Sequence, residues 1–237
     1  MRKSLLGREE KFLGVEARSI REIIFGIEDG LITTLSVVVG VSGAIAENRI
    51  IIIAGIAALL AEAISMSAGA YLSTKSQREF FERRLRDELD EIRRKPQEEK
   101  DEIRQIYEAK GFSGEQLDVI VEQITSDREL WLKEMAAGEL GLIPERFENP
   151  VKAASIFLAS SMVGAIPLLP YLLLDVTNSI IAATISTIIV LFVAGALKSK
   201  LTKTNWLKSG SEMMAIGMLA GILGYLVGTA LRVSAIH

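Results

Sequence analysis

Acidic side chains at helical spacing are the first feature of this sequence that could do chemistry. Glu88 and Glu91 stand at i and i+3, and Glu99 and Glu102 repeat that spacing. On a helix each pair shares one face, where like charges repel by about 0.2–0.5 kcal/mol unless a cation neutralises them. A divalent metal ion would neutralise them. The alternative is that both pairs are solvated faces of charged helices, interleaved with Arg83, Arg84, Arg86, Arg93 and Arg94.

Two methionine–carboxylate combinations could also bind a metal ion. Met135 and Glu139 stand at i and i+4, so a soft and a hard donor share a helix face. Asp29 lies six residues after the start of the first apolar stretch, and Met66 lies six residues before the end of the second. The two stretches run in opposite directions, so both residues lie toward the same side of the membrane. At 1.5 Å per residue both lie ~9 Å deep. A thioether with a carboxylate suits a borderline ion such as Fe²⁺ better than Mg²⁺ or Ca²⁺.

Each residue in the apolar stretches also has a simpler interpretation. Asp29 is alternatively an interface-level helix cap, and Met66 a packing residue. Glu62 lies deeper, ~15 Å from the end of its stretch. It is either a proton or ion relay, or it is paired with Lys152. An unpaired carboxylate within hydrocarbon is costly, so such residues normally face the interior of a helix bundle and have a function.

The elements that must position these residues are five apolar stretches. The chain of 237 residues is 24% charged, yet its mean hydropathy is +0.32, so charge and hydrophobicity are segregated. Each stretch is close to the ~20 residues that cross a bilayer core. We therefore predict an all-α membrane protein with five transmembrane helices. The stretches are 23–45, 50–72, 151–174, 178–197 and 213–231.

Lysine and arginine in the flanking segments predict the orientation. The N-terminal tail, the long segment after the second stretch and the loop before the fifth stretch are rich in these residues, and the alternate loops are poor in them. The pattern places the N-terminus and the long segment in the cytoplasm and the C-terminus outside. The short tails and loops favour a prokaryotic cell membrane over an organelle membrane such as the vacuole.

The long segment predicts a helical cytoplasmic insert between spans two and three. It divides the chain into 1–74, 75–150 and 151–237, and the middle part has 20 acidic and 14 basic residues, a net charge of −6. We expect span two to continue as one helix to about Lys95, where Pro96 ends it. A second helix should end at Gly111. Ser113 with Gln116, and Ser126 with Glu129, resemble capping boxes that open two more, the last ending near Gly141.

Two further features bear on helix packing. Span five carries Gly217, Gly221, Gly224 and Gly228, a small face that lets another helix approach closely. Pro167 and Pro170 predict a kink in span three.

Composition excludes several classes of function. A net charge of −3 argues against a nucleic-acid partner, because such proteins are usually basic. The chain has no cysteine, and its one histidine is His237, which excludes thiolate sites and leaves little room for histidine catalysis. No nucleophile–base pair and no motif for a prosthetic group is visible, so a membrane enzyme is the least favoured class.

Three runs of the sequence are distinctive: E-D-G-L-I-T at the start of span one, S-M-S-A-G-A-Y-L-S-T-K-S-Q at the end of span two, and W-L-K-E-M-A-A-G-E-L-G-L before span three. Together they resemble the vacuolar iron transporter family of divalent-metal/proton antiporters. The resemblance covers nearly the whole chain and implies a homodimer with the ion pathway between subunits. It also implies that the insert binds metal ions and gathers them below the pathway.

The resemblance assigns roles to the same residues. It implies Asp29 and Met66 in the pathway, and as metal ligands of the insert it implies Glu88, Glu91, Glu99, Glu102, Met135 and Glu139. Two positions depart from the family pattern. The second methionine of the M-M-x-x-E ending is Ala136 here, and the acidic position that usually follows S-M-x-x-G is Ala70. Glu62 lies eight residues before Ala70, ~12 Å along the helix, so it cannot occupy the same point.

The sequence therefore favours a secondary transporter that exports Fe²⁺ or Mn²⁺ from the cytoplasm in exchange for protons. The ion would be both the transported species and the ligand of the insert. The alternative is a membrane-anchored metal-storage or buffering protein. Carboxylates inside the spans argue against that alternative, because a simple anchor does not need them.

Overall fold

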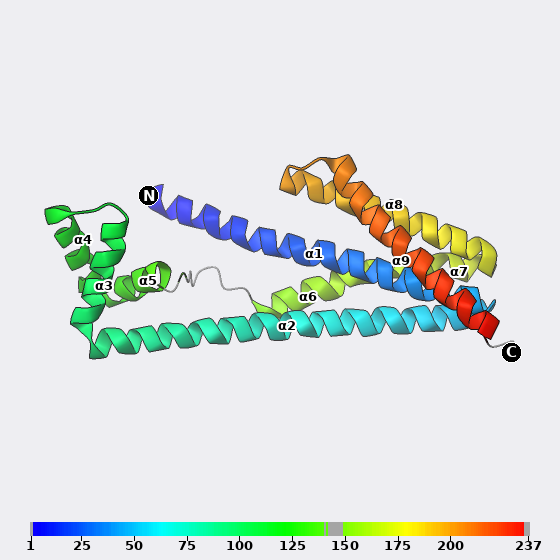
Figure 1. Cartoon of the computed structure of the whole chain (residues 1–237), viewed down its shortest axis with the longest axis horizontal. Coiled ribbons are helices and arrows are strands. Elements are labelled where there is room, and N and C mark those ends of the chain that lie inside the picture. The colour runs from blue at the N-terminus through cyan, green and yellow to red at the C-terminus, as the bar shows by residue number, and fades with distance from the viewer. Residues whose placement is uncertain (1, 140, 142–148, 235–237) are drawn as a thin grey trace. The chain divides into compact units, whose positions relative to one another are not determined.

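The structure is a computed structural model that describes residues 2–139, 141 and 149–234. Within these ranges every regular element is a helix (Figure 1). Their bounds are α1 Arg2–Ala44, α2 Asn48–Arg94, α3 Pro96–Ala109, α4 Gly114–Ser126, α5 Arg128–Gly138, α6 Pro150–Ser161, the 3₁₀ helix η2 Met162–Leu168, α7 Leu169–Leu173, α8 Val176–Thr202 and α9 Trp206–Ser234.

Five helical segments of the described residues are long and apolar enough to cross a membrane. They are Ser19–Ala44, Asn48–Arg94, Pro150–Leu173, Val176–Lys200 and Trp206–Arg232. Each coincides with one of the five predicted stretches. The all-helical class and the five candidate spans are therefore confirmed.

The second candidate span is a single uninterrupted helix. α2 has 47 residues, which at 1.5 Å per residue is about 70 Å, more than twice a ~30 Å hydrocarbon core. It ends at Arg94, and the next helix begins at Pro96, whose ring supplies no N–H and suits a first helical turn. The predicted continuation of span two and its end at Pro96 are confirmed.

The helices α4 and α5 begin without the predicted capping boxes. Ser113 is the N-cap residue of α4, but its side chain makes no capping hydrogen bond. The predicted cap at Ser126 is wrong. Asp127 caps α5 instead, because its Oδ1 accepts from the N–H groups of Glu129 (2.9 Å) and Leu130 (3.2 Å). A carboxylate stabilises a helix N-terminus better than a neutral hydroxyl. Gly111, which was predicted to end the preceding helix, follows α3 and has a φ of +94°. A positive φ is typical of a glycine that ends a helix.

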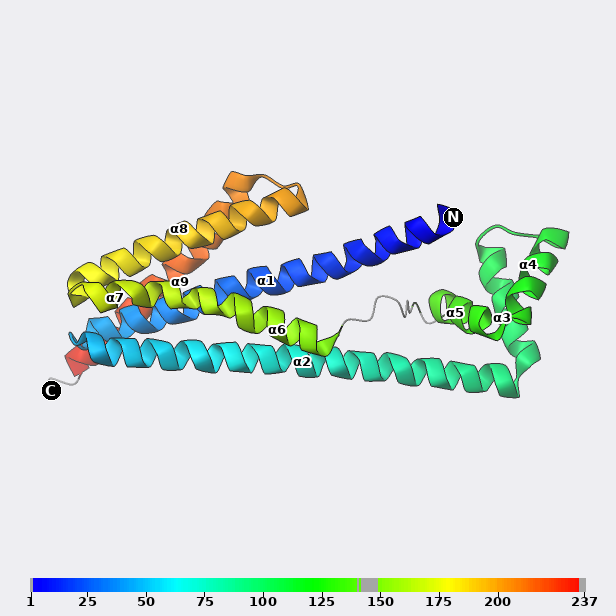
Figure 2. The ribbon, with the colours of Figure 1, turned by 180° about the vertical axis from the view of Figure 1, so that it is seen from behind.

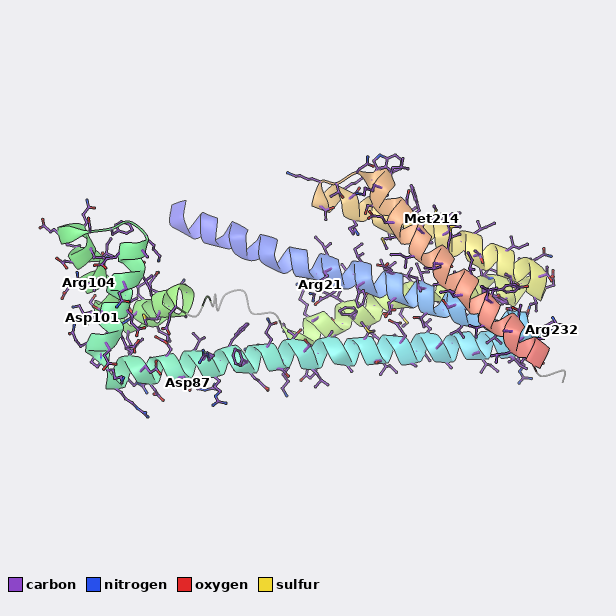
Figure 3. All side chains as sticks on the ribbon, viewed as in Figure 1. Arg21, Asp87, Asp101, Arg104, Met214 and Arg232 are labelled. Atoms are coloured by element: carbon purple, nitrogen blue, oxygen red, sulfur yellow. The ribbon has the colours of Figure 1, made fainter. Side chains whose placement is uncertain are left out.

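Chain contacts define two compact units. The first is Met1–Lys11 with Ser73–Asn149, and the second is Phe12–Leu72 with Pro150–His237. The first unit has a core of its own, to which α2, α3, α4 and α5 contribute Ile92, Ile103, Val121 and Trp131. On its surface Arg104, labelled on α3 in Figure 3, forms an ion pair of 2.7 Å with Asp118 of α4.

In the second unit α1 lies between the third span and α9. Figures 1 and 2 show α9 on one side of α1 and the run from α6 to α7 on the other, with α8 packed along α9. Glycine makes both approaches close. A Cβ on Gly30 would stand 2.5 Å from the carbonyl oxygen of Ser161, and one on Gly224 would stand 2.5 Å from that of Ser36. The predicted small face of span five therefore packs against α1.

The third span is interrupted in its middle. It runs as α6, changes to the 3₁₀ helix η2 and resumes as α7. Pro167 lies inside η2 and cannot donate to the helical ladder. The predicted departure from a regular helix is confirmed. Gly164 in the same segment would place a Cβ 2.5 Å from the carbonyl oxygen of Gly30, so the backbones of α1 and η2 touch there.

Substitution of Gly224 by alanine should destabilise the helix bundle. The added methyl meets backbone atoms of Ser36, which cannot move aside as a flexible side chain would. We expect a loss of about 1–3 kcal/mol, the usual cost of overpacking. Thermal unfolding of the detergent-solubilised chain would measure it. Gly69→Ala is the matched control, because a Cβ at Gly69 has open space around it. Equal stability of Gly224→Ala and the control would contradict the packing role.

Candidate metal and transport sites

Five carboxylates of the first unit come together in one group, here called the insert cluster. It forms two triads that share Glu99. The ligand oxygens of Glu88, Glu91 and Glu99 lie within 4.8 Å of one another, and so do those of Glu99, Glu102 and Glu139. The two predicted glutamate pairs are therefore close together in space, and Glu139 of the third predicted pair joins them.

The break in the chain at Pro96 creates the insert cluster. Glu88 and Glu91 lie on the last turns of α2, whereas Glu99 and Glu102 lie on the first turns of α3. Because α3 turns away from α2 at this break, two faces that are distant on one continuous helix meet across the corner. Glu139 is the C-cap residue of α5, whose N–H donates to the carbonyl oxygen of Met135 (2.9 Å).

Two members of the insert cluster are deeply buried. Glu88 is 3% exposed and Glu99 is 4% exposed. Burial first, and then the negative charges of Glu139, Glu99 and Glu91, together raise the pKa of Glu88 to about 8. Burial and then the neighbouring carboxylates, Glu102 first, also raise the pKa of Glu99. Buried and mutually repelling carboxylates require protons or a cation for neutralisation.

The charged form of Glu139, at the other end of the cluster, is disfavoured in the same way. Burial raises its pKa, and the charges of Glu102 and Glu91 raise it further, against a lowering by the Arg84 guanidinium. Other arginines of α2 pair with carboxylates outside the cluster: Arg78 with Glu82 (2.8 Å), Arg83 with Asp87 (3.8 Å) and Arg93 with Asp90 (3.5 Å). The alternative interpretation, a solvated helix face, therefore fits Glu91, which is exposed. It does not fit Glu88 or Glu99, which are buried.

Met135 lies in the apolar core of the first unit. It is fully buried and packs in the cluster that includes Ile103 and Trp131. Ala136 beside it is fully buried as well. Every side chain of the insert cluster itself is a carboxylate, so the oxygen-rich donor set suits harder divalent ions. A role of the Met135 sulfur as a ligand stays a prediction.

In the second unit the structure brings Asp29 of α1 against Glu62 of α2. Their carboxyl groups lie close enough to share a hydrogen bond when one of them is protonated, and Ser161 Oγ donates to Glu62 Oε1 at 3.3 Å. Both acids are half-buried. Glu62 is therefore partnered by Asp29 and Ser161, and the described ion pairs include none between Glu62 and Lys152. The structure therefore gives no support to the alternative that Glu62 pairs with Lys152.

The close approach of α1 and the third span builds this site. Gly30 follows Asp29 directly, and its missing side chain lets the backbone at Ser161 come close. Met66 lies one turn beyond Glu62 on α2 and is half-buried. Sequence reasoning missed Ser161. Its only signal was a pair of serines, Ser160 and Ser161, in an otherwise apolar run ahead of a glycine and a proline.

Comparison with known proteins agrees with the membrane architecture. A family model described as the VIT family matches residues 20–229. The chain is 33% identical over 208 residues to "Vacuolar iron transporter 1" of Arabidopsis thaliana, covering 87% of this chain and 83% of that protein. It is 35% identical over 225 residues to "Vacuolar iron transporter" of Plasmodium falciparum, covering 90% and 82%. A similar protein of Centaurea cyanus is 32% identical over 225 residues, covering 94% and 92%.

The raised pKa values predict that metal-free protein loses stability as pH rises. Between pH ~4.5 and ~8 the folded chain holds a proton on Glu88 that the unfolded chain has released, so the free energy of unfolding falls across this window. Trp131 lies in the core of the first unit, and in a Trp206→Phe background its fluorescence reports that unit.

Urea unfolding of this variant at several pH values, with a chelator present, would measure the effect. Glu88→Gln should flatten the dependence, whereas Glu122→Gln, an exposed residue of α4, should leave it unchanged. If the free energy of unfolding of the Trp206→Phe chain stays constant or increases from pH 5 to 8, the carboxylates of the cluster do not repel one another as inferred.

Proposed function

The chain belongs to the VIT family, and on that premise we propose that it exports Fe²⁺ or Mn²⁺ from the cytoplasm in exchange for protons. The observation that carries the proposal is the close pair of carboxyl groups, Asp29 and Glu62, within two candidate spans. Two carboxyl groups can share a hydrogen bond only when one of them holds a proton. The same oxygens can instead hold a divalent cation, so one site can serve both ions of an exchange.

The exchange follows from competition at this pair. A divalent ion that arrives from the cytoplasm displaces the shared proton and is held by Asp29 and Glu62, with Met66 as a soft donor nearby. Protons that enter from the opposite side neutralise the carboxylates and release the ion. Ser161 donates to Glu62 and so fixes one carboxylate oxygen, which leaves the other free to coordinate. A carboxylate inside the hydrocarbon region is normally retained for such a function.

The insert cluster serves this pathway as an ion-collecting site in the proposal. In the proposal the N-terminus and residues 75–150 lie in the cytoplasm, and the lysine and arginine distribution supports this orientation. The net charge of −6 in that segment raises the local concentration of cations. Glu88, Glu91, Glu99, Glu102 and Glu139 then bind the ion. Met135, in the apolar core of the same unit, is the candidate soft ligand.

We further propose that the active form is a homodimer with the ion pathway between subunits. The supporting observation is the outer face of α2 in the second unit. Ile53, Leu60 and Ile64 are 59%, 48% and 63% exposed and share one face of the helix. A second copy that covers this face would pack against these side chains, and close packing is the main attraction between helices within a bilayer.

Glu99→Gln should remove most metal binding by the insert, because Glu99 belongs to both triads. We expect the Mn²⁺ affinity to fall at least tenfold. That is the lower limit of the usual loss in metal affinity when a residue that supports a metal site is removed. Calorimetric titration of the full chain in detergent would measure it. Glu122→Gln removes one exposed acidic charge outside the cluster and should leave the affinity unchanged. Unaltered binding in Glu99→Gln would favour the solvated-face interpretation.

Asp29→Asn should abolish transport but leave metal binding by the insert intact. Asparagine keeps the shape of the side chain but cannot exchange a proton. Metal flux and internal pH would be followed together in proteoliposomes with an imposed pH gradient. Glu28→Gln is the matched control, since it removes the neighbouring carboxylate of the same helix. Met66→Ala should lower the apparent affinity for Fe²⁺ more than for the harder Mn²⁺.

The outcomes separate transport from storage. Absence of flux in the native chain, with metal binding intact, would favour the membrane-anchored storage function. Near-normal flux in Asp29→Asn would remove that residue from the pathway. Equal losses for both ions in Met66→Ala would remove the soft-donor argument.

A further inference from the structure

One edge of the helix bundle has an apolar groove that nothing in the proposed transport cycle uses. The groove encloses about 290 Å³ between α1, η2 and α8. Its walls are almost purely aliphatic and include Ile20, Ile23, Ile27, Val190, Val193 and Leu197. Ile23, Val193 and Leu197 are 41%, 48% and 53% exposed, so the groove opens toward the surroundings of the bundle rather than into its core.

A polar cleft of about 270 Å³ lies between the end of α8 and the start of α9. Its basic side chains are Lys198 and Lys208, and its hydroxyl groups come from Thr202, Thr204 and Ser209. Glu212 is its one carboxylate. The lining charge is therefore positive, which fits an anionic group.

Lys198 lines both the groove and the cleft. Its aliphatic stem therefore meets the apolar walls while its ammonium group meets the polar lining, as amphipathic side chains do at a membrane surface. Glu28 of α1 also attracts Lys198 electrostatically. The structure thus joins a hydrocarbon-lined space to a cationic one at a single side chain.

Lys198, where the groove meets the cleft, lies at the depth of lipid headgroups. The candidate span of α8 ends at Lys200, and that of α9 begins at Trp206. Trp206 packs edge-on against Phe192, with ring centroids 6.0 Å apart. Tryptophan is typical of the membrane–water interface. The cleft therefore lies where phosphate groups of a bilayer lie, and the groove lies where acyl chains begin.

Ser209 adds an independent sign of a missing partner. The residue is 5% exposed and lines the cleft, yet its Oγ has no hydrogen-bond partner among the described residues. Buried hydroxyl groups are normally paired. Asn205, which caps α9 by accepting from the N–H groups of Leu207 (2.9 Å) and Lys208 (3.2 Å), fixes the first turn that carries Ser209.

We propose that the groove and cleft together bind one anionic phospholipid of the surrounding bilayer. The phosphate lies in the cleft, held by Lys198 and Lys208 and by the hydroxyl of Ser209, and one acyl chain lies in the groove. A lipid explains both cavities at once, whereas a free anion would leave the groove unused. Because Lys198 also attracts Glu28, the neighbour of Asp29, the bound lipid adjoins the element that carries the transport site.

The test is the stabilisation of delipidated full-length protein in detergent by added lipid. Phosphatidylglycerol should raise the melting temperature, and phosphatidylcholine at equal concentration should raise it less than half as much. The double variant Lys198→Gln/Lys208→Gln should need at least five times more phosphatidylglycerol for the same shift. The control Lys152→Gln/Lys200→Gln loses the same charge at exposed positions outside the cleft and should respond as the native chain does.

The groove is tested separately from the charge. Val193→Trp should fill it and weaken the phosphatidylglycerol effect, whereas Ile189→Trp places the same side chain at an exposed position of α8 outside the groove. Native mass spectrometry would count retained lipids in each variant. Lys208→Gln alone, at an exposed site, gives a second charge variant where the double variant fails to fold.

Three results would overturn the proposal. Equal losses in the cleft and control double variants would mean a general charge effect. Equal stabilisation by glycerol phosphate without acyl chains would mean a soluble-anion site. An unchanged response of Val193→Trp would mean that no chain occupies the groove.

Discussion

Two carboxyl groups at hydrogen-bond distance need a proton or a cation between them, and this constraint governs both acidic sites of the chain. In the first unit it acts on Glu88 and Glu99, which are almost completely buried. In the second it acts on Asp29 and Glu62, which lie close together inside candidate spans. Neither pair is tolerable as two bare charges in a poorly solvated place. Either a proton or a cation can neutralise each pair, and the proposed metal–proton exchange rests on that choice.

The rest of the fold brings the carboxyl groups of these two sites together. Glycine at position 30 and glycine at position 164 bring α1 against η2, and this contact sets Ser161 beside the carboxylate of α2. The break between α2 and α3 brings two faces of glutamate together that one straight helix would keep apart. A glycine in a helix costs about 0.5–1 kcal/mol relative to alanine. That cost is repaid by close packing, which is the main attraction between helices within a bilayer.

Much of this was predictable from the sequence because its signals are local. Apolar stretches of about 20 residues and the proline at position 96 fix the spans and the end of α2. The i, i+3 spacing identified the glutamates of α2 and α3, which the structure then groups. What was missed depended on contacts between distant segments. Pairing of Glu62 with Lys152 was reasonable by charge alone, but the structure sets Asp29 and Ser161 there instead. No spacing rule relates a serine of the third span to an acid of the second.

The donor chemistry bears on how tightly the proposed collecting site should hold its ion. A second thioether is absent because Ala136 replaces it, and Met135 lies within the apolar core of the first unit. The insert cluster therefore offers carboxylate oxygens, which bind a divalent ion chiefly by charge, and Glu88 with a pKa of about 8 keeps a competing proton at neutral pH. An ion that binds there would displace that proton, so its affinity should fall as the pH falls. This competition would let the proposed collecting site release its ion, as a supply to the transport pathway requires.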